Sequence, residues 1–457
     1  MVTEHSRRGF LMASASAAVA GLTMARDVSA GTQDSAPAAA PAFNVPTPVL
    51  ERWRGDRFGM FIHWGLYSLL GRGEWVIFSE QIDYREYKRL MDRFTAAEFD
   101  PDAWAATAKA AGMKYTVLTS RHHDGFCLWD SKVSDFKCTR SAARRDLVAE
   151  YTRACRKAGL LVGLYYSPLD WRFPGFFFPG MYRENAEALK QQTYDQVREL
   201  LTNYGKIDIL WFDGGGDDWL GLGGLEFGEG GWHTRDRAKH YEGRPLWEAE
   251  KLYAMIRELQ PDVIMNDRAA SHGDWQGDFS TPEQRIGAFE TQRPWESCMT
   301  LCTSWGYRTN DTMKSLGTVL QLLVRAAVGD GNLLLNVGPT AAGIIEPRQV
   351  QRLKGVGEWL GQYGESIYGT RGGPFPSAGW GGCTWRGNKV YVHVLDWPED
   401  YVQLPPTPNR IVSSRSLTGS QVKVDQTAEG VRIAVPAPER QAIDTVIALE
   451  LDGPASG

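Results

Sequence analysis

Asp213 follows a short apolar run, a position that suits a catalytic carboxylate. Residues 207–212 are rich in β-branched and aromatic side chains, which is typical of a buried parallel strand. Asp213 comes directly after them, and three glycines follow it. In α/β enzymes the catalytic groups gather at the carboxyl ends of such strands. An aspartate there can also cap the next helix, so the rest of the chain must decide between the two roles.

Five other apolar runs end in the same way. The runs 57–62, 114–119, 160–164, 262–265 and 332–335 lead into polar and aromatic groups that include His63, His122, His123, Tyr165, Ser167, Asn266, Arg268 and Asn336. Helix-like stretches lie between the runs, at 101–111, 146–158, 185–203, 246–260 and 312–328. This alternation predicts an α/β fold of the (β/α)8 barrel type, with the active site at the carboxyl ends of the strands. Two further strands, expected between 269 and 310, cannot be read from the sequence.

Hydrolysis of a sugar acetal needs a second carboxyl group across the cleft from Asp213. The candidates are Glu283, Glu290 and Glu296 downstream and Glu74 upstream, and composition does not choose among them. The chain has 17 tryptophans, and several of them follow strands. Aromatic faces in a polar cleft suit the C–H face of a sugar ring, so their clustering favours a carbohydrate substrate.

The His122-His123-Asp124 segment could ligate a metal, as in metal-dependent hydrolases. Adjacent histidines in an extended segment point to opposite sides, however, and no histidine pair at metal-site spacing accompanies them. We therefore expect neutral imidazoles that hydrogen bond to ligand hydroxyls, with no metal and no other cofactor.

The first thirty residues predict a twin-arginine signal peptide. Arg7 and Arg8 precede an apolar stretch, and residues 28–30 form a small-residue cleavage site. Residues 31–44 read as a disordered linker. No other segment is apolar for long enough to span a membrane, and the net charge of −5 contains no block of one sign that would indicate nucleic acid. We expect export to the periplasm or the exterior.

The pattern changes near residue 366. Short strand-like runs at 388–395, 410–414, 421–425, 431–434 and 445–449 predict a β-sandwich over 366–457, after a barrel over 45–365. Whether the sandwich binds sugar is left open. The six cysteines do not predict a disulfide framework in a chain of 457 residues, and the sequence does not indicate an oligomeric state.

Taken together, the motifs resemble one known family. They are FGMFIHWG at 58–65, GEW at 73–75, HHDGF at 122–126, LYYS at 164–167, LWFDG at 210–214, NDR at 266–268, TPE at 281–283 and SWGY at 304–307. In this order, over residues 45–365, they resemble the α-L-fucosidases of glycoside hydrolase family 29.

The resemblance implies a retaining exo-glycosidase that removes terminal α-L-fucose from fucosylated oligosaccharides or glycoconjugates, on a (β/α)8-like barrel followed by a β-sandwich. By motif, Asp213 takes the nucleophile's place and Glu283 that of the acid/base, with Glu296 as the alternative. The residues that match sugar-binding positions are His63, Glu74, Trp75, His122, His123, Tyr165, Trp211 and Arg268. A glycine-rich insertion at 214–244 departs from the family pattern, and we expect it to form a lid or an aglycone site.

Two rival hypotheses remain at this stage. One is a metal-dependent hydrolase on the same barrel, which a chelator would inactivate. The other is an inactive sugar-binding relative, although a lectin would need neither Asp213 nor Glu283.

Overall fold

The structure is a computed structural model that describes residues 48–177, 182–214, 225–228, 231–234, 248–269 and 277–455. The predicted signal peptide and linker lie outside the described residues, as does most of the insertion at 214–244. Of that insertion, the described part is Gly214 and the backbone of a hairpin, β5 (Leu225–Gly228) and β6 (Gly231–Thr234). In the part that is described, no helix combines the length and apolarity needed to cross a bilayer.

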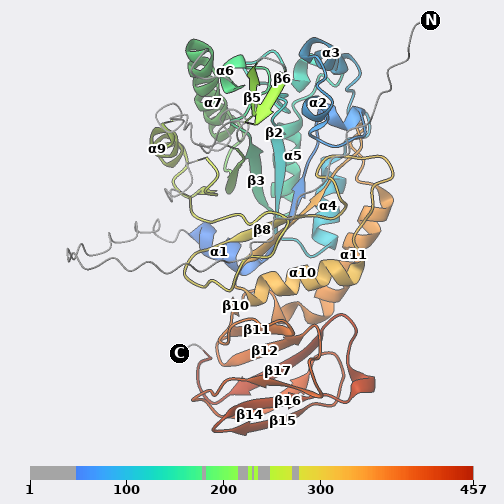
Figure 1. Cartoon of the computed structure of the whole chain (residues 1–457), viewed down its shortest axis with the longest axis vertical. Helices are drawn as coiled ribbons and strands as arrows, with labels where there is room; N and C mark the ends of the chain where they lie inside the picture. The colour runs from blue at the N-terminus through green and yellow to red at the C-terminus, as the bar shows by residue number, and fades with distance from the viewer. Residues whose placement is uncertain are drawn as a thin grey trace, which may run out of the picture. The chain divides into compact units, whose positions relative to one another are not determined.

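A parallel sheet of seven strands forms the centre of the catalytic region (Figure 1). In spatial order the strands are β7 (Ile264–Met265), β4 (Ile209–Phe212), β3 (Leu161–Tyr166), β2 (Tyr115–Arg121), β1 (Phe58–Ile62), β9 (Asn332–Val337) and β8 (Glu296–Thr300). Six of these strands confirm the apolar runs found in the sequence. The seventh, β8, lies in the region where no strand could be read.

An irregular segment joins the two edge strands. Phe279 forms a parallel bridge with Asn266 after β7, whereas Glu283 bridges Cys298 on β8. Backbone hydrogen bonds support both sides: Asp267 N–H donates to Phe279 O at 3.1 Å, and Cys298 N–H donates to Pro282 O, also at 3.1 Å. Residues 279–283 therefore occupy the eighth strand position and close the predicted barrel.

The interior of the barrel is filled by side chains from every strand and from the closing segment. They are Phe61, Tyr115, Val117, Leu161, Tyr165, Ile209, Trp211, Ile264, Phe279, Cys298 and Leu334. Helix α1 (Pro48–Asp56) adds Trp53, whose ring centroid lies 4.6 Å from that of Phe279. The barrel is thus a packed core that leaves the carboxyl ends of the strands for ligands.

Helices cover the outside of the strands (Figure 1). The five predicted ones are present as α4 (Pro101–Ala110), α5 (Leu147–Lys157), α7 (Arg183–Asn203), α9 (Ala249–Leu259) and α10 (Leu316–Val328). Short helices α2 (Val76–Ser79), α3 (Tyr84–Lys88) and α6 (Pro174–Phe177) lie in the loops. Asp100 caps α4 as expected, since its carboxylate accepts from Ala103 N–H at 3.0 Å.

Helix α11 (Pro347–Tyr363) was not predicted, because its three glycines lower the intrinsic helix propensity. The structure shows why one of them is needed. A Cβ atom on Gly357 would lie 1.8 Å from the carbonyl oxygen of Ala110 in α4. The missing side chain lets the two helices approach closely, and this tertiary contact outweighs the local propensity.

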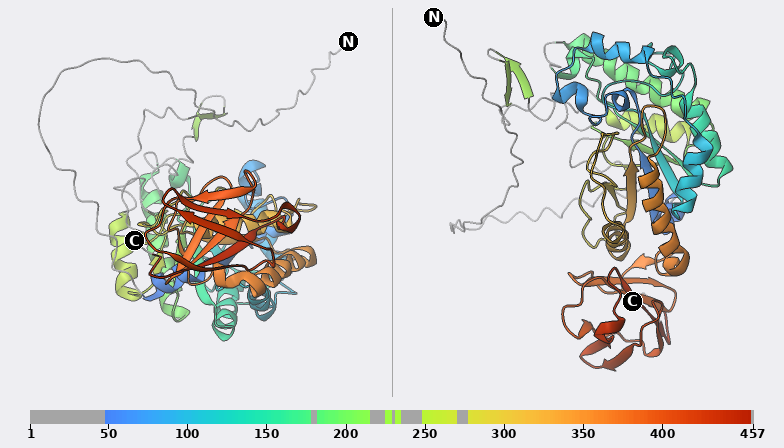
Figure 2. Two further views of the ribbon diagram at one scale, coloured as in Figure 1. Left: turned by 90° about the horizontal axis from the view of Figure 1, so that it is seen from below. Right: turned by 90° about the vertical axis from the view of Figure 1, so that its right-hand side faces the viewer.

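Two antiparallel sheets form the C-terminal β-sandwich (Figure 2). One contains β10 (Arg371–Gly372), β11 (Gly381–Arg386), β12 (Lys389–Val394), β17 (Thr445–Leu451) and β14 (Ile411–Ser416), and the other contains β13 (Tyr401–Leu404), β16 (Gly430–Ala434) and β15 (Lys423–Thr427). Apolar side chains from both sheets share one core. The five predicted strands are confirmed, whereas β10, β11 and β13 were not predicted.

A buried aspartate ties the first sandwich strand to the barrel. Asp330 accepts hydrogen bonds from Arg57 at 2.7 Å, from Arg54 at 3.3 Å and from Arg371 of β10 at 2.5 Å. Its side chain is fully buried, so these cations offset the cost of burying its charge. All six cysteines are buried and free, which agrees with the absence of a predicted disulfide framework.

Candidate active site

A pocket opens at the carboxyl ends of the barrel strands. Its lining residues are Phe61, His63, Trp75, His122, His123, Tyr165, Trp211, Asp213, Arg268, Glu283, Cys298 and Trp305. The structure therefore brings together nine of the predicted site residues from seven separate stretches of chain. Phe61, Cys298 and Trp305 were missed, although Trp305 belongs to the SWGY motif, which could have marked it.

Glu74 is not among the residues that line this pocket, and its predicted contact with the sugar stays a prediction. Its buried carboxylate accepts from Gly306 N–H at 2.7 Å and from the Ser304 hydroxyl at 3.3 Å. Burial raises the pKa of Glu74, although these hydrogen bonds act to lower it. The contacts instead fix the turn that carries Trp305 into the pocket wall.

Glu296 is also not among the residues that line this pocket, and its contact with a substrate stays a prediction. It is the first residue of β8, at the amino end of the strand, and it pairs with Asn332. Its carboxylate accepts from the Tyr115 hydroxyl at 2.5 Å and from the Trp211 indole at 3.2 Å. Burial raises its pKa to about 7 against the effect of these hydrogen bonds. Glu296 thus supports Trp211 from below.

Asp213 is held by three polar neighbours at the end of β4. The Tyr165 hydroxyl donates to its Oδ2 at 2.9 Å, Arg268 Nη1 donates to its Oδ1 at 2.9 Å, and His123 Nε2 lies 3.5 Å from Oδ2. Burial by itself raises the pKa of this carboxyl. Arg268, His123 and the Tyr165 hydrogen bond outweigh that effect, so the pKa of Asp213 is lowered. The group is therefore ionised at neutral pH, as a nucleophile must be.

Glu283 faces Asp213 from the closing segment of the barrel. The same Arg268 nitrogen, Nη1, lies 2.9 Å from Asp213 Oδ1 and 2.9 Å from Glu283 Oε2. These two oxygens can be separated by no more than twice that distance. Retaining glycosidases hold their two carboxyl groups about 5–5.5 Å apart, whereas inverting ones need about 6.5–9.5 Å. This upper limit lies below the inverting range, so the arrangement of the pair agrees with a retaining site.

The two carboxylates differ in exposure and in support. The Glu283 side chain is 44% exposed, and that of Asp213 is 15% exposed. Arg268 is fixed between them, because it donates to the Thr281 hydroxyl at 2.7 Å and to the Thr281 carbonyl at 2.9 Å, and its guanidinium lies over the Trp211 ring. Asp213 is the less exposed of the two carboxylates. Glu283, the more exposed one, can reach the solvent side of the pocket, where a leaving group would depart.

The three histidines of the pocket are neutral. Burial lowers the pKa of His63 to about 3, even though the hydrogen bond to Asn336 and the charge of Asp213 act to raise it. Burial likewise lowers the pKa of His123 to about 4 and places that of His122 well below its ordinary value. His63 Nδ1 lies 2.6 Å from Asn336 Oδ1, which fixes its ring. Uncharged rings of this kind can exchange hydrogen bonds with the hydroxyls of a neutral sugar.

A metal site would need several suitable side chains close together. Within the part of the chain that the structure describes, no three histidine, cysteine, aspartate or glutamate side chains come together as a metal-binding group. The two adjacent histidines instead contact other residues: His122 stacks on Tyr165 at 5.8 Å between ring centroids, and His123 lies beside Asp213.

The pocket lies at the carboxyl end of a parallel barrel, and it places two facing carboxylates among aromatic rings and neutral imidazoles. This arrangement defines a glycoside hydrolase of the retaining type. Residues 27–365 match the sequence profile of the family described as Alpha-L-fucosidase. The chain belongs to the alpha-L-fucosidase family, glycoside hydrolase family 29.

Relatives and solved structures agree with this assignment. The tissue alpha-L-fucosidase of Mus musculus is 30% identical over 420 residues, which cover 83% of this chain and 86% of that protein. Alpha-L-fucosidase isoenzyme 1 from Paenibacillus thiaminolyticus is 37% identical with a TM-score of 0.75, and the match covers 89% of this chain and 99% of that one.

A third similar structure bears on the chemistry. It is a family 29 alpha-L-fucosidase from Bacteroides thetaiotaomicron, trapped as a covalent intermediate in complex with 2-fluoro-fucosyl fluoride. It is 27% identical with a TM-score of 0.79, and the match covers 91% of this chain and 98% of that one.

Proposed function

We propose that this protein hydrolyses terminal α-L-fucosides of fucosylated glycans with retention of configuration, through a covalent fucosyl-enzyme. The observation that carries the proposal is the sharing of Arg268 Nη1 by Asp213 and Glu283, which holds one oxygen of each carboxylate closer together than an inverting site requires. The covalent intermediate trapped in the Bacteroides relative supports the same course of reaction.

In the first step, an Asp213 oxygen attacks the anomeric carbon of fucose. The bond from that carbon to the glycosidic oxygen breaks, and Glu283 donates its proton to the departing oxygen. In the second step, Glu283 takes a proton from water, the water oxygen attacks the anomeric carbon, and the ester to Asp213 breaks. Asp213 leaves as a carboxylate that Tyr165 and Arg268 stabilise by their hydrogen bonds.

The rest of the pocket suits a neutral deoxy sugar. Three uncharged imidazoles can bond its hydroxyls, with Arg268 beside the ring. Phe61 lies between Trp211 and Trp305, at 5.0 and 5.9 Å between ring centroids, and these rings form an apolar wall for the C5 methyl group. Trp75 completes the wall on the side of His123, 5.4 Å from that ring.

The first prediction concerns substrate choice. An aryl α-L-fucoside should be turned over at least about 10²-fold faster, in kcat/KM, than the matching aryl α-D-galactoside, because the galactoside adds a C6 hydroxyl and presents its ring hydroxyls to the wrong partners. Both assays are run with and without a chelator. Equal turnover of the two glycosides would overturn the assignment. Loss with chelator and recovery with zinc would favour the metal-dependent alternative, and binding of fucose without any turnover would favour the sugar-binding one.

The second prediction concerns location, and we propose export by the twin-arginine route. The proposal is supported by the Arg7-Arg8 pair, the apolar stretch after it and the small residues at 28–30. Replacing both arginines by lysine should trap the precursor inside the cell, as measured by fractionation and N-terminal sequencing. Lysine keeps the positive charge of arginine, so the variant tests the arginines themselves. Export of the double-lysine variant at the wild-type level would contradict this interpretation of the N-terminus.

A further inference from the structure

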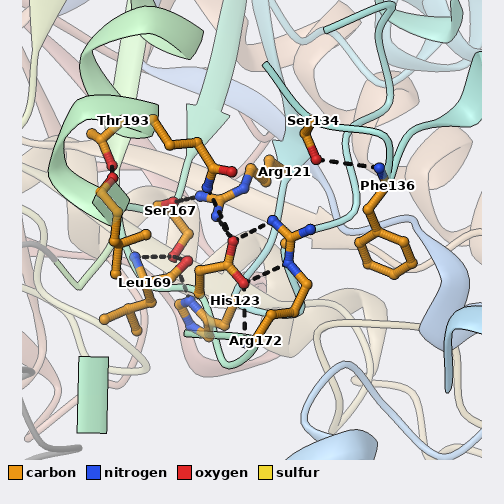
Figure 3. Close-up of polar contacts among 12 residues, drawn as sticks. Arg121, His123, Ser134, Phe136, Ser167, Leu169, Arg172 and Thr193 are labelled. Atoms are coloured by element: carbon orange, nitrogen blue, oxygen red, sulfur yellow. Dashed lines mark hydrogen bonds and ion pairs between the residues drawn. The ribbon is translucent and has the colours of Figure 1, made fainter. Parts of the chain in front are cut away.

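The turn that follows β3 contacts the imidazole beside Asp213 (Figure 3). The hydroxyl of Ser167 lies 2.6 Å from Nδ1 of His123, whose other nitrogen, Nε2, lies 3.5 Å from Asp213 Oδ2. Ser167 and His123 are both buried, at 0% and 1% exposure. Ser167 was noted in the sequence as a polar group at a strand end and as part of the LYYS motif, and the chemistry described above does not use it.

The hydrogen-bond roles in this chain of contacts can be worked out. A neutral imidazole carries one N–H, so either Nδ1 or Nε2 is protonated. If the proton were on Nδ1, the lone pair of Nε2 would face the carboxylate of Asp213, and two acceptors would oppose each other. If it is on Nε2, the N–H is on the nitrogen nearest the carboxylate, 3.5 Å from Asp213 Oδ2, and the unprotonated Nδ1 can accept a hydrogen bond. The Ser167 hydroxyl can supply it, because its other acceptors are more distant, at 3.3 Å for Asp213 O and 3.5 Å for Leu169 O.

We propose that Ser167 is a positioning residue, which donates its hydroxyl proton to Nδ1 of His123 and thereby fixes the tautomer whose Nε2–H faces Asp213. This inference rests on the proposed function in one respect, since Asp213 is taken as the nucleophile. The N–H stabilises the carboxylate before attack, and it also fixes the plane of the ring at the pocket wall.

Ser167 itself is held by a buried ion-pair network. Its backbone N–H donates to the carbonyl of Arg121 at 3.1 Å, and the Arg121 guanidinium donates back to the Ser167 carbonyl. The same guanidinium pairs with Asp170, and both side chains are fully buried. Arg172 also donates to Asp170, through Nε at 2.7 Å. Figure 3 shows Arg121 and Arg172 of this network beside Ser167 and His123.

The contacts around Ser167 determine where its hydroxyl proton points. Leu169 N–H donates to the Ser167 hydroxyl oxygen at 3.1 Å and so occupies one of its lone pairs. A serine whose main chain is fixed on both sides, and whose oxygen already accepts one bond, directs its own proton to the remaining close acceptor, which is Nδ1.

Ser141 offers a matched control for a substitution. It is also buried, and it accepts from the backbone N–H two residues later, Ala143, at 3.2 Å, as Ser167 does from Leu169. Its hydroxyl donates to the carbonyl of Cys138 at 2.7 Å, and it contacts no pocket residue among those named above. Ser167→Ala and Ser141→Ala therefore remove the same local turn bond, but only the first removes a donor to an imidazole.

The test is the third prediction, and it combines ¹⁵N spectra of histidine-labelled protein with pH profiles. The ring signal that disappears in His123→Gln identifies His123. In the wild type at neutral pH we expect a protonated Nε2 and an unprotonated Nδ1; in Ser167→Ala we expect both tautomers.

In the same variant, kcat/KM for an aryl fucoside should fall roughly 10-fold, as for a lost hydrogen bond. The acid limb of its pH profile should move to higher pH, because a less ordered Nε2–H beside the carboxylate stabilises the ionised form of Asp213 less. Ser141→Ala should change neither tautomer nor acid limb.

Two outcomes would overturn the inference. One is a wild-type His123 protonated on Nδ1. The other is a Ser167→Ala protein with an unchanged tautomer and acid limb, even if its activity falls, because that loss would be structural. The spectra need no substrate. If the wild type turned over no fucoside at all, the proposed function would fail, while the tautomer measurement would still decide the role of Ser167.

Discussion

Asp213→Ala is expected to lower kcat by about 10⁴-fold or more on every fucoside, whatever its leaving group, because no ester intermediate can form. Incubation with 2-fluoro-fucosyl fluoride, the compound bound in the Bacteroides intermediate, should expel fluoride and add the mass of one 2-fluoro-fucosyl group to the wild type and none to the variant. In the labelled wild type, the modified peptide should contain Asp213.

Asp124→Asn is the matched control for this experiment. Asp124 is another buried aspartate at a strand end, but its carboxylate accepts from the Tyr87 hydroxyl at 2.7 Å and does not line the pocket. It should remain able to form the labelled species. A labelled Asp213→Ala protein, or a label found on a different carboxylate, would show that the nucleophile lies elsewhere.

Glu283→Ala should be selective where Asp213→Ala is general. Substrates with poor leaving groups, such as fucosylated oligosaccharides, need protonation of the departing oxygen, and their kcat/KM should fall by about 10²–10⁴-fold. Aryl fucosides with acidic leaving groups should keep most of their rate of glycosylation. Azide needs no general base, so added azide should restore turnover and give a fucosyl azide of retained configuration, which can be identified by NMR.

Glu296→Ala separates the two candidates for the acid/base. Glu296 does not line the pocket, and it accepts a hydrogen bond from the indole N–H of Trp211. Its replacement should therefore lower kcat/KM for all substrates alike and should show no azide rescue. If Glu296→Ala instead showed the selective, azide-rescued pattern and Glu283→Ala did not, the acid/base would be Glu296, and the assignment of Asp213 would still stand.

The sequence alone was sufficient to predict those elements whose pattern is local. Buried parallel strands read as apolar runs, and a polar group directly after such a run lies at the barrel mouth whatever the details of packing. That reasoning placed His63, His123 and Asp213 correctly in one pocket. The helices between the strands could be found because their caps and stops are local as well, as with Asp100 before α4.

The rest depended on tertiary contacts. Residues 279–283 make isolated bridges to two different strands, so they have no strand pattern of their own, and Pro282 interrupts any regular ladder. The position of Glu296 in the fold could not be predicted for a related reason. Without the boundaries of β8, the sequence could not show that this glutamate begins the strand, beneath the pocket, while Cys298 two residues later reaches its wall. The hydrogen-bond partners of Glu74 could not be predicted, because they lie more than 200 positions away along the chain.

The irregular closure of the barrel has a consequence for how such an enzyme can diversify. In a regular strand, an insertion of one residue turns every following side chain to the opposite face. The segment that carries Glu283 is bound to its neighbours only at separate points, so a change in its length need not be transmitted through a continuous ladder. Asp213, by contrast, follows a strand paired on both sides, where such a change would be disruptive. Evolution or a protein engineer could therefore relocate Glu283, the proposed proton donor, while Asp213 and the strand that carries it keep their places.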